Sequence, residues 1–261
     1  MEVIITENKQ SAEETVASIL AAQITRKPQS LLGLATGRTM ESVYSLLIKK
    51  HEEEGLNFSS ISTVNLDEYV GLPADHDQSY RYYMNHHLFS KVNIPEANTH
   101  LPDGMASDIP AECARYEGVI KNLGGIDLQL LGIGTDGHIG FNEPGSSLVS
   151  RTRIKTLTRE TVEQNGTIFG DESMVPRHAL TMGVGTIMDA DKVVLLATGT
   201  AKAEIIADAV EGPLTAWITA SALQMHKSAL VVVDEDAATK LKNYDYYKWA
   251  YENKPDWQKH F

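Results

Sequence analysis

The chain carries a dense group of chemically able side chains between residues 126 and 145, which read IDLQLLGIGTDGHIGFNEPG. An apolar run at 126–133 predicts a buried strand, and Asp136, His138, Asn142 and Glu143 follow it among glycines. Histidine exchanges protons near neutral pH, and a carboxylate beside it can orient it. Because ligands bind at the carboxyl ends of strands in open α/β sheets, we expect an acid–base site in this loop.

Three of the glycines also match a dinucleotide-binding fingerprint. Gly132, Gly134 and Gly137 have the spacing G-x-G-x-x-G directly after the predicted strand, and in nicotinamide- and flavin-binding proteins this motif opens a helix. Here residues 141–145, FNEPG, break such a helix at its start. We therefore expect no dinucleotide cofactor.

The rest of the chain alternates short apolar runs with helical patterns. Strands are predicted at residues 3–5, 31–34, 61–66, 152–157, 179–182, 193–197 and 229–233. One helix is predicted to begin at the capping box Ser11-x-x-Glu14, and a second follows the turn at 35–39. Three more helices are predicted at 79–89, 109–123 and 201–210. This alternation predicts one three-layer α/β/α domain over residues 1–261, with a Rossmann-like, mostly parallel sheet, helices on both faces and an aromatic tail at 244–261.

Composition excludes several classes of protein. The net charge of −12 argues against nucleic acid, whose phosphates select basic surfaces, although a local nest of N–H groups with one or two cations still binds a small anion. There is no 18-residue apolar run and no signal pattern at the start, so we expect no membrane segment and a cytoplasmic location. The single cysteine, Cys113, rules out an internal disulfide and a multi-cysteine metal site.

Polar residues follow four of the predicted strands. They lie at 36–39, at 67–68, in the loop after residue 133 and at 198–202. Parallel strands end at one edge of a sheet, so segments far apart in the sequence can meet there. We expect these four segments to form one pocket.

Each segment also has a simpler interpretation. Residues 36–39 fit a βα turn with a Thr N-cap, Asp67 and Glu68 fit a cap and a solvated carboxylate, and His138 fits a hydrogen-bonded structural histidine. Lys202 is less natural as a plain surface lysine, because it lies early in a predicted helix, against the helix dipole. The joint occurrence of the four segments favours a functional site.

Motifs along nearly the whole chain resemble the glucosamine-6-phosphate deaminase family. They are LGLATGRT, NLDEYVGL, GIGTDGHIGFNEPGSSL, SRTRIKTLT, VPRHALTMGVGTI and GTAKAE. The pair NLDEYVGL and DGHIGFNEP is highly specific for that family. The related 6-phosphogluconolactonases share a Gly-x-Asp-Gly-His core but usually continue it with Thr-Ala-Ser-Leu-Phe. The continuation here is Ile-Gly-Phe-Asn-Glu, which favours the deaminases.

The resemblance implies conversion of glucosamine 6-phosphate and water to fructose 6-phosphate and ammonia, without a cofactor or a metal ion. His138 matches the residue that opens the sugar ring, and Asp136 and Glu143 match the carboxylates that orient it. Asp67 matches the base that moves a proton between C2 and C1 of the open sugar. A carboxylate suits this role because it can reach both carbons on one face of the substrate.

The substrate phosphate is expected at the turn after the second predicted strand. Backbone N–H groups of Thr36, Gly37, Arg38 and Thr39 would hold it, with Lys202 as the counter-charge.

The chain departs from the family at two cation positions. Family members commonly have Gly or Ser where this chain has Arg38, and an arginine where, across a one-residue gap, it has Thr167-Ile168-Phe169. We hypothesise that Arg38 replaces the missing cation. The alternative is a weaker phosphate site or another sugar preference, and the choice between glucosamine and galactosamine 6-phosphate stays open.

A second group resembles the allosteric pocket of the family, which binds N-acetylglucosamine 6-phosphate between subunits of a hexamer. Its members here are Ser146, Ser147, Arg153, Lys155, Thr156 and, in the tail, Tyr246. The alternative is that Arg153 and Lys155 are the solvated face of an ordinary strand. We predict an allosteric homohexamer.

Two other functions stay open. A lactonase for a phosphorylated sugar acid would share the fold and the phosphate site. A non-catalytic sugar-phosphate sensor is the second, because the same fold type also serves as an effector domain. The chain retains every expected catalytic group, which favours the deaminase.

Overall fold

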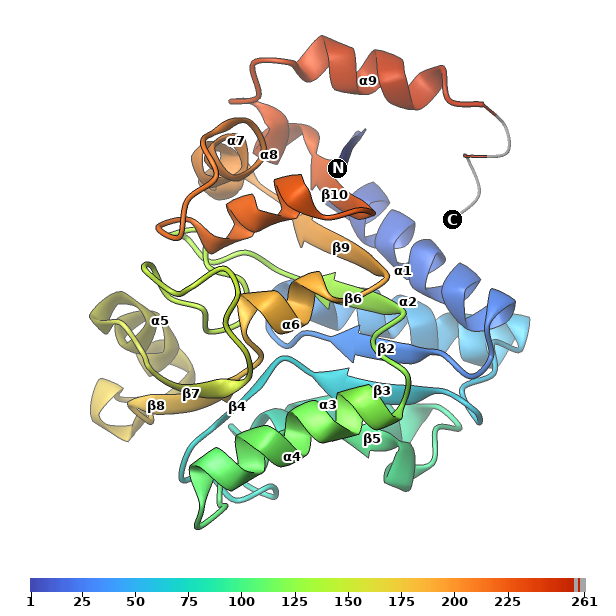
Figure 1. The fold of residues 1–261 in the computed structure, drawn as a ribbon. Coiled ribbons are helices and arrows are strands. Elements are labelled where there is room, and N and C mark those ends of the chain that lie inside the picture. The colour runs from blue at the N-terminus through green and yellow to red at the C-terminus, as the bar shows by residue number, and fades with distance from the viewer. Residues whose placement is uncertain (256–257, 259–261) are drawn as a thin grey trace.

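The centre of the molecule is a seven-stranded sheet (Figure 1). The computed structural model describes residues 1–255 and 258, and only the backbone of residues 164, 167 and 168. The strand order is β1-β10-β9-β6-β2-β3-β5, and all neighbours pair in parallel. The strands are β1 (Glu2–Thr6), β2 (Leu31–Leu34), β3 (Ser62–Asn65), β5 (Thr99–His100), β6 (Leu128–Leu131), β9 (Lys192–Ala197) and β10 (Ala229–Asp234). The predicted α/β class with a mostly parallel sheet is confirmed.

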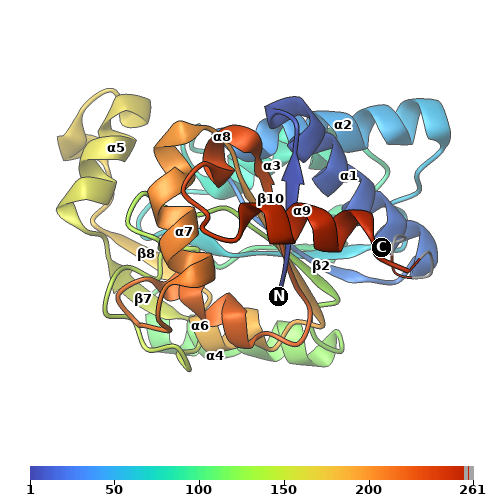
Figure 2. The same ribbon diagram turned by 90° about the horizontal axis from the view of Figure 1, so that it is seen from above.

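Helices cover both faces of this sheet (Figure 2). α1 (Lys9–Arg26) and α2 (Arg38–Glu54) lie over one face, and α4 (Ile109–Asn122) and α6 (Val184–Met188) lie over the other. Parallel strands buried on both sides need apolar cover on both sides, and β10 is buried along its whole length. The remaining helices are α3 (Tyr80–His87), α5 (Arg159–Phe169), α7 (Ala203–Glu211), α8 (Glu235–Ala238) and α9 (Tyr244–Glu252), with 3-10 turns at Phe89–Lys91, Glu96–Asn98, Glu172–Met174, Thr200–Lys202 and Thr219–Met225.

A second, three-stranded sheet lies beside the first, in the antiparallel order β4-β8-β7. Its strands are β4 (Asp67–Tyr69), β8 (His178–Thr181) and β7 (Arg153–Thr156). Asp67–Tyr69 was predicted as the end of the strand at 61–66. Instead the chain changes sheets at Leu66, whose N–H donates to Leu34 in the large sheet and whose carbonyl accepts from Met182. The predicted strands at 152–157 and 179–182 are present, but they belong to this small sheet.

Two predicted helix starts are wrong. α1 begins at Lys9 and not at Ser11, because Oδ1 of Asn8 accepts a hydrogen bond from the backbone N–H of Ser11 (2.9 Å) and caps the helix. The helix predicted at 201–210 opens with the 3-10 turn Thr200–Lys202, and α7 proper starts at Ala203. Both errors are of a few residues, and they leave the layers unchanged.

The tail contains a helix that the sequence pattern did not predict. α9 lies along the edge strand β1, and its Tyr244, Tyr247 and Tyr251 pack partly buried against the core. Tyr246 and Trp249 on the same helix are each 63% exposed. Trp257, which also belongs to the predicted aromatic tail, lies outside the described residues. No helix in the described part of the chain is long and apolar enough to cross a membrane.

Candidate active site

The polar strand ends meet in one pocket of about 540 Å³. It is lined from the turn after β2, from β4, from the loop after β6 and from the turn after β9, by residues that include Thr36, Gly37, Arg38, Thr39, Asp67, His138 and Lys202. The four segments that were predicted to converge therefore do so. Two larger and more open hollows, of about 930 and 1010 Å³, share none of these residues.

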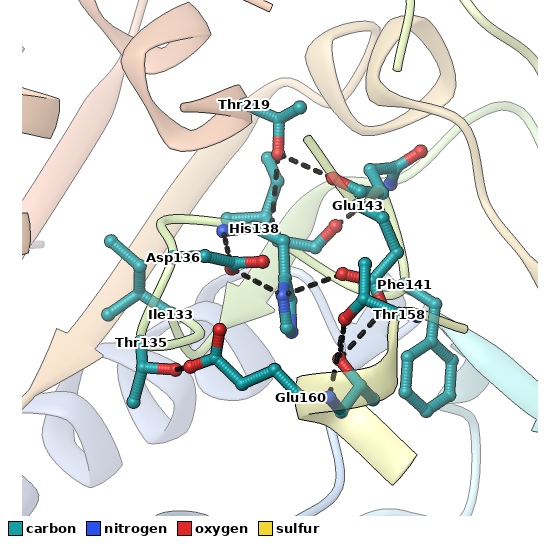
Figure 3. Close-up of polar contacts among 12 residues, drawn as sticks. Ile133, Thr135, Asp136, His138, Phe141, Glu143, Thr158, Glu160 and Thr219 are labelled. Carbon is teal, nitrogen blue, oxygen red and sulfur yellow. Dashed lines mark hydrogen bonds and ion pairs between the residues drawn. The ribbon is translucent and has the colours of Figure 1, made fainter. Parts of the chain in front are cut away.

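His138 stands between two carboxylates in this pocket (Figure 3). Its Nδ1 lies 2.7 Å from Oδ1 of Asp136 and 3.4 Å from Oε2 of Glu143. Burial alone would lower the pKa of His138, but the two carboxylates outweigh burial and raise this pKa to about 9. A pKa of about 9 favours the protonated ring at neutral pH, so the imidazolium can donate a proton.

The glycines of the central loop make room for this histidine. A Cβ on Gly134 would lie 2.4 Å from Cε1 of the His138 ring, so the imidazole rests directly on the backbone there. Gly137 has φ +85°, a left-handed conformation that glycine adopts at little cost. No helix directly follows Gly137 in the described chain, so the helix that the dinucleotide fingerprint requires is missing, and Gly134 and Gly137 shape the loop around the imidazole.

Both carboxylates beside the imidazole are held in their charged form. Burial favours the neutral acid, but the contacts with His138 keep the pKa of Asp136 and of Glu143 below their ordinary values. Oε1 of Glu143 also accepts hydrogen bonds from the N–H of Thr158 (3.1 Å) and from Oγ1 of Thr161 (2.8 Å). The site thus holds an imidazolium between two carboxylates.

Asp67 and Glu68 are adjacent in β4 but have different surroundings. Burial and the neighbouring Glu68 raise the pKa of Asp67 to about 8, although His138 opposes this rise. No donor among the described residues hydrogen-bonds to the Asp67 carboxylate, which lines the pocket. Glu68 instead accepts hydrogen bonds from the N–H groups of Tyr69, Tyr80 and Arg81, at 2.9, 3.0 and 3.0 Å. The described residues thus leave the Asp67 carboxylate without a hydrogen-bond donor, whereas Glu68 anchors the start of α3.

Glu68 and Asp67 are both buried, at 3% and 6% exposure. Neither carboxylate is solvated, so that part of the simpler interpretation is wrong. The other part, a helix cap, is correct for Glu68, whose carboxylate accepts hydrogen bonds from the first N–H groups of α3.

The other end of the pocket can receive an anion. Gly37 (φ +110°) precedes the first turn of α2, a helix of 17 residues, so N–H groups and the positive end of the dipole face this side. Lys202 reaches the same region and donates from Nζ to the carbonyl of Ile133 (2.8 Å). Burial lowers the pKa of Lys202, while Asp136 opposes this. Arg38 is exposed on the pocket wall.

Several threonines at the site were missed in the sequence. Thr158 and Thr161 bind Glu143, and Thr219 bridges the loop by accepting from the N–H of Ile139 (3.3 Å) and donating to the carbonyl of Asn142 (3.0 Å). A scattered hydroxyl carries no distinctive pattern. Only the helix start after Thr158 in the motif SRTRIKTLT could have indicated these contacts.

The candidate regulatory residues lie partly together. Arg153 and Lys155 are half-buried on one face of β7, whereas Ile154 and Thr156 are exposed on the other. Arg153 and Lys155 are thus only partly solvated, and Thr156 points away from them. Ser146 is buried with an Oγ that has no hydrogen-bond partner within the described residues.

The last two candidate regulatory residues, Ser147 and Tyr246, lie outside β7. Ser147 is exposed on the loop after residue 145. Tyr246 lies on α9, which both views place apart from β7 (Figures 1 and 2). One chain therefore does not bring Tyr246 to the other members.

One cluster of described side chains could hold a metal ion. The ligand atoms of Asp136, His138 and Glu143 lie within 4.8 Å of one another. These are the same atoms that form the imidazolium–carboxylate contacts, so an ion and the histidine proton would compete for one place.

Comparison with known proteins shows the family to which the chain is similar. Residues 6–232 match the family described as glucosamine-6-phosphate isomerases/6-phosphogluconolactonase. A glucosamine-6-phosphate deaminase of Arthrobacter sp. (strain FB24) is 52% identical over 258 residues, 99% of either chain. The solved structure of a monomeric glucosamine-6-phosphate deaminase is 43% identical, with a TM-score of 0.90 over 92% of this chain and 100% of the other. The 6-phosphogluconolactonase from Trypanosoma cruzi shares the fold, with a TM-score of 0.75 at 20% identity over 92% of this chain and 97% of its own.

Proposed function

Since the chain belongs to the family of glucosamine-6-phosphate isomerases and 6-phosphogluconolactonases, we propose that the pocket around His138 is the site of its reaction. It catalyses the conversion of glucosamine 6-phosphate and water to fructose 6-phosphate and ammonia, like the deaminases that it matches over 99% of its length. The observation that carries the assignment of the site is the placement, in one pocket, of a charged His138–carboxylate cluster and of Asp67, to which no described residue donates a hydrogen bond.

Ring opening is the first step that these residues can perform. The ring oxygen must gain a proton as its bond to C1 breaks, and the hydroxyl on C1 must lose one. The His138 imidazolium can donate the first proton, and the imidazole that remains can accept the second. Asp136 and Glu143 stabilise the imidazolium and fix the orientation of the imidazole ring, so His138 is protonated and oriented before the substrate binds.

Isomerisation follows on the open chain. The Asp67 carboxylate removes the proton from C2, and the carbonyl oxygen on C1 gains a proton, which gives an enolamine. Return of the proton to C1 then leaves a protonated imine at C2. A buried carboxylate with a pKa of about 8 is a stronger base than an ordinary aspartate, which suits removal of a proton from carbon.

Deamination completes the sequence. Water adds to the imine carbon at C2, and the carbon–nitrogen bond breaks to release ammonia and leave the ketone of fructose 6-phosphate. C1 is reduced from an aldehyde to an alcohol while C2 is oxidised to the imine, and hydrolysis of the imine changes no oxidation state, so no external oxidant or reductant is needed.

We propose that the substrate phosphate binds at the start of α2, with Lys202 and Arg38 as its cations. The support is the free helix start behind Gly37 and the location of both cations on the pocket wall. The position where the family has an arginine falls at Thr167-Ile168, whose side chains lie outside the described part of the structure. If Arg38→Ala changes KM less than about threefold, well below the roughly 1.5–3 kcal/mol of a charge-assisted contact, Arg38 is not the replacement.

We also propose that Ser146, Ser147, Arg153 and Lys155 bind a regulatory sugar phosphate, N-acetylglucosamine 6-phosphate. The support is the half-buried pair of cations on β7 and the buried hydroxyl of Ser146, which has no hydrogen-bond partner among the described residues. Arg153 also donates to Oδ1 of Asn142 (2.8 Å), next to Glu143 in the catalytic loop. An anion on Arg153 would thus act one residue from the catalytic carboxylate.

The remaining members of this proposal need a neighbouring subunit. Thr156 faces away from Arg153, and Tyr246 lies on a distant helix, so Tyr246 joins the site only from a second chain. This is consistent with the predicted hexamer. The monomeric deaminase that is 43% identical to this chain shows that the opposite assembly also occurs in the family. The cytoplasmic location stays a prediction, which cell fractionation tests.

An assay that couples ammonia release to glucosamine 6-phosphate tests the activity. We expect ammonia and fructose 6-phosphate in equal amounts, and galactosamine 6-phosphate in a parallel reaction reports the preference at C4. Full activity is expected after exhaustive chelation, because no step above uses a metal ion. Hydrolysis of 6-phosphogluconolactone without ammonia release from either amino sugar would assign the chain to the lactonase branch instead.

A further inference from the structure

The first turn of α5 contacts the catalytic loop on both sides of His138 (Figure 3). Before the histidine, Oγ1 of Thr135 donates to Oε1 of Glu160 at 2.8 Å. After it, Oε1 of Glu143 accepts from the N–H of Thr158 and from Oγ1 of Thr161. α5 thus holds the loop at two points, and one of them is a carboxylate next to the imidazole.

Next to the His138 imidazolium, these contacts with α5 also stabilise the charge of Glu143. The residue is 2% exposed, and its Oε2, 3.4 Å from Nδ1 of His138, has no hydrogen-bond donor in good geometry within residues 1–255. Asp136 lies closer to the same nitrogen, at 2.7 Å, so one N–H cannot serve both carboxylates well. A buried charge without donors is costly, and the hydrogen-bond donors to Oε1 of Glu143 among the described residues are the N-cap and the first turn of α5.

Thr161 is the side chain that supplies one of these donors. It is 6% exposed, and its hydroxyl lies 2.8 Å from Oε1 of Glu143. The other donor is the backbone of Thr158, the N-cap residue of α5, where the helix dipole also favours a negative charge. The Thr161 hydroxyl also lies 3.0 Å from that of Thr158, so the threonine pair orders the turn that faces Glu143.

We propose that Thr161 is a positioning residue, whose hydroxyl keeps Glu143 ionised and aimed at His138. The first turn of α5 then governs the acid that opens the sugar ring. The effect of Thr161 on ring opening rests on the proposed role of His138, whereas the contact between Thr161 and Glu143 is independent of that role. Thr161 takes no part in the proton transfers of ring opening, and it acts through Glu143.

An NMR titration of the His138 ring measures the contact without any substrate. The ring signal, assigned with His138→Gln, shows a separate inflection at acidic pH when a neighbouring carboxylate takes up a proton. Glu143→Gln identifies the inflection that belongs to Glu143, because only that one disappears. In Thr161→Val we expect this inflection to move up by about 1 pH unit or more, since a hydrogen bond to a charged group contributes roughly 1.5–3 kcal/mol.

Thr161→Ser is the matched control, because it keeps the hydroxyl and should restore the wild-type inflection. In the Glu143→Gln background, Thr161→Val should change the His138 titration no further, as expected for two residues that act as one unit. Thermal unfolding is measured for each variant first, and Thr161→Ala provides a second hydroxyl deletion if the valine variant does not fold. An unchanged Glu143 inflection in a folded hydroxyl-deletion variant overturns the proposal.

Kinetics connect the contact to turnover. We expect Thr161→Val to lower kcat about tenfold or more, with KM within about twofold, because the loss falls on proton transfer and not on phosphate binding. Thr161→Ser should recover most of kcat. If wild-type protein releases no ammonia, the proposed function fails, yet the titration still decides whether Thr161 holds Glu143. If kcat falls equally in Thr161→Val and Thr161→Ser, the hydroxyl is not the cause, and the positioning role is rejected.

Discussion

Asp67 and Glu68 differ in role because they differ in hydrogen bonding. We predict that Asp67→Asn lowers turnover by at least the roughly 100-fold typical of a lost general base, since an amide keeps the shape but accepts no proton. Binding of a competitive sugar-phosphate analogue should be retained. Steady-state kinetics together with calorimetric binding of the analogue check this.

Glu68→Gln provides the contrast at the next position. It places an NH₂ group against backbone N–H donors of β4 and α3, so we expect a loss of about 1–3 kcal/mol in the free energy of unfolding. The properly folded fraction should still turn over. Retained turnover in Asp67→Asn, with loss in folded Glu68→Gln, would exchange the two roles.

The pH profile follows from two neighbouring groups. Asp67 acts as a base only when it is deprotonated, so kcat/KM should rise with pH up to its pKa of about 8. His138 donates a proton only when it is protonated, so kcat/KM should fall above its pKa of about 9. We therefore predict a narrow maximum on the alkaline side of neutrality, measured as kcat/KM against pH.

Asp136→Asn tests whether His138 causes the fall of kcat/KM at high pH. Asp136 raises the pKa of His138, so its loss should move the fall in kcat/KM to lower pH and leave the rise at Asp67 in place. A broad profile without either limb near these values would show that other groups control the rate.

The meeting of these residues in one pocket could be predicted from sequence because each motif combines unusual types at fixed spacing. DGHIGFNEP contains an imidazole with two carboxylates and NLDEY contains Asp67, and the structure brings these groups together. Which of Asp67 and Glu68 is free could not be predicted, because the donors to Glu68 come from Tyr80 and Arg81, beyond an intervening loop.

At the level of elements, His226 ties two strand starts together. It is 5% exposed, its Nε2 lies 2.9 Å from the carbonyl of Ala190 before β9, and its Nδ1 accepts from the N–H of Ser228 (2.9 Å) before β10. That pattern requires the neutral ring, with its proton on Nε2. Burial lowers the pKa of His226 below its ordinary 6.5.

This histidine predicts an acid-sensitive fold. A group whose pKa is lower in the folded state contributes stability that is present above its unfolded pKa, about 6.5, and is lost as pH falls through the folded pKa. Chemical denaturation at pH 7.5 and at lower values should show this loss. His226→Gln should be less stable at pH 7.5 but should lose less on acidification. A mutant with the same pH slope as wild type would assign the acid sensitivity to other groups.

The elements themselves were predictable where an apolar run is long or a cap is strong. β9 and α4 lie within a residue of their predicted bounds. The start of α1 was misplaced because Ser11 and Asn8 are both good caps, and the choice between them depends on which side chain reaches an N–H. The contacts of α5 with Glu143 come from tertiary packing, which no local pattern reports.

At the scale of the whole molecule, the large parallel sheet could be predicted from the sequence, whereas the pairing of the small sheet could not. Alternating strands and helices indicate the parallel sheet directly. The small sheet has strands of three or four residues, and it pairs Asp67 with Thr181 across more than a hundred positions. Such pairing has no turn or short loop to indicate it, so the change of sheet at Leu66, which brings Asp67 to the pocket, is known only from the structure.

Assembly is the largest scale at which a prediction is still open. We predict a homohexamer, with a sigmoidal glucosamine 6-phosphate curve that becomes more hyperbolic when N-acetylglucosamine 6-phosphate is added. Arg153 and Lys155 are half-buried cations, and a phosphate bound to them would bear on the Arg153 contact with Asn142. Coupling of roughly 1–3 kcal/mol between the two sites would be ordinary.

Arg153→Ala with Lys155→Ala should abolish this activation without lowering maximal turnover. Removing two cations elsewhere, at Lys9 and Lys49, whose side chains are 60% and 64% exposed, is the matched control and should leave the activation intact. Tyr246→Ala should weaken the activation only in an assembled protein, because its helix lies apart from β7 within one chain. A monomer by light scattering would place this chain with the monomeric deaminase that it resembles. A hyperbolic curve that the acetylated sugar does not change would reject the regulatory site and leave Arg153 a structural role beside Asn142.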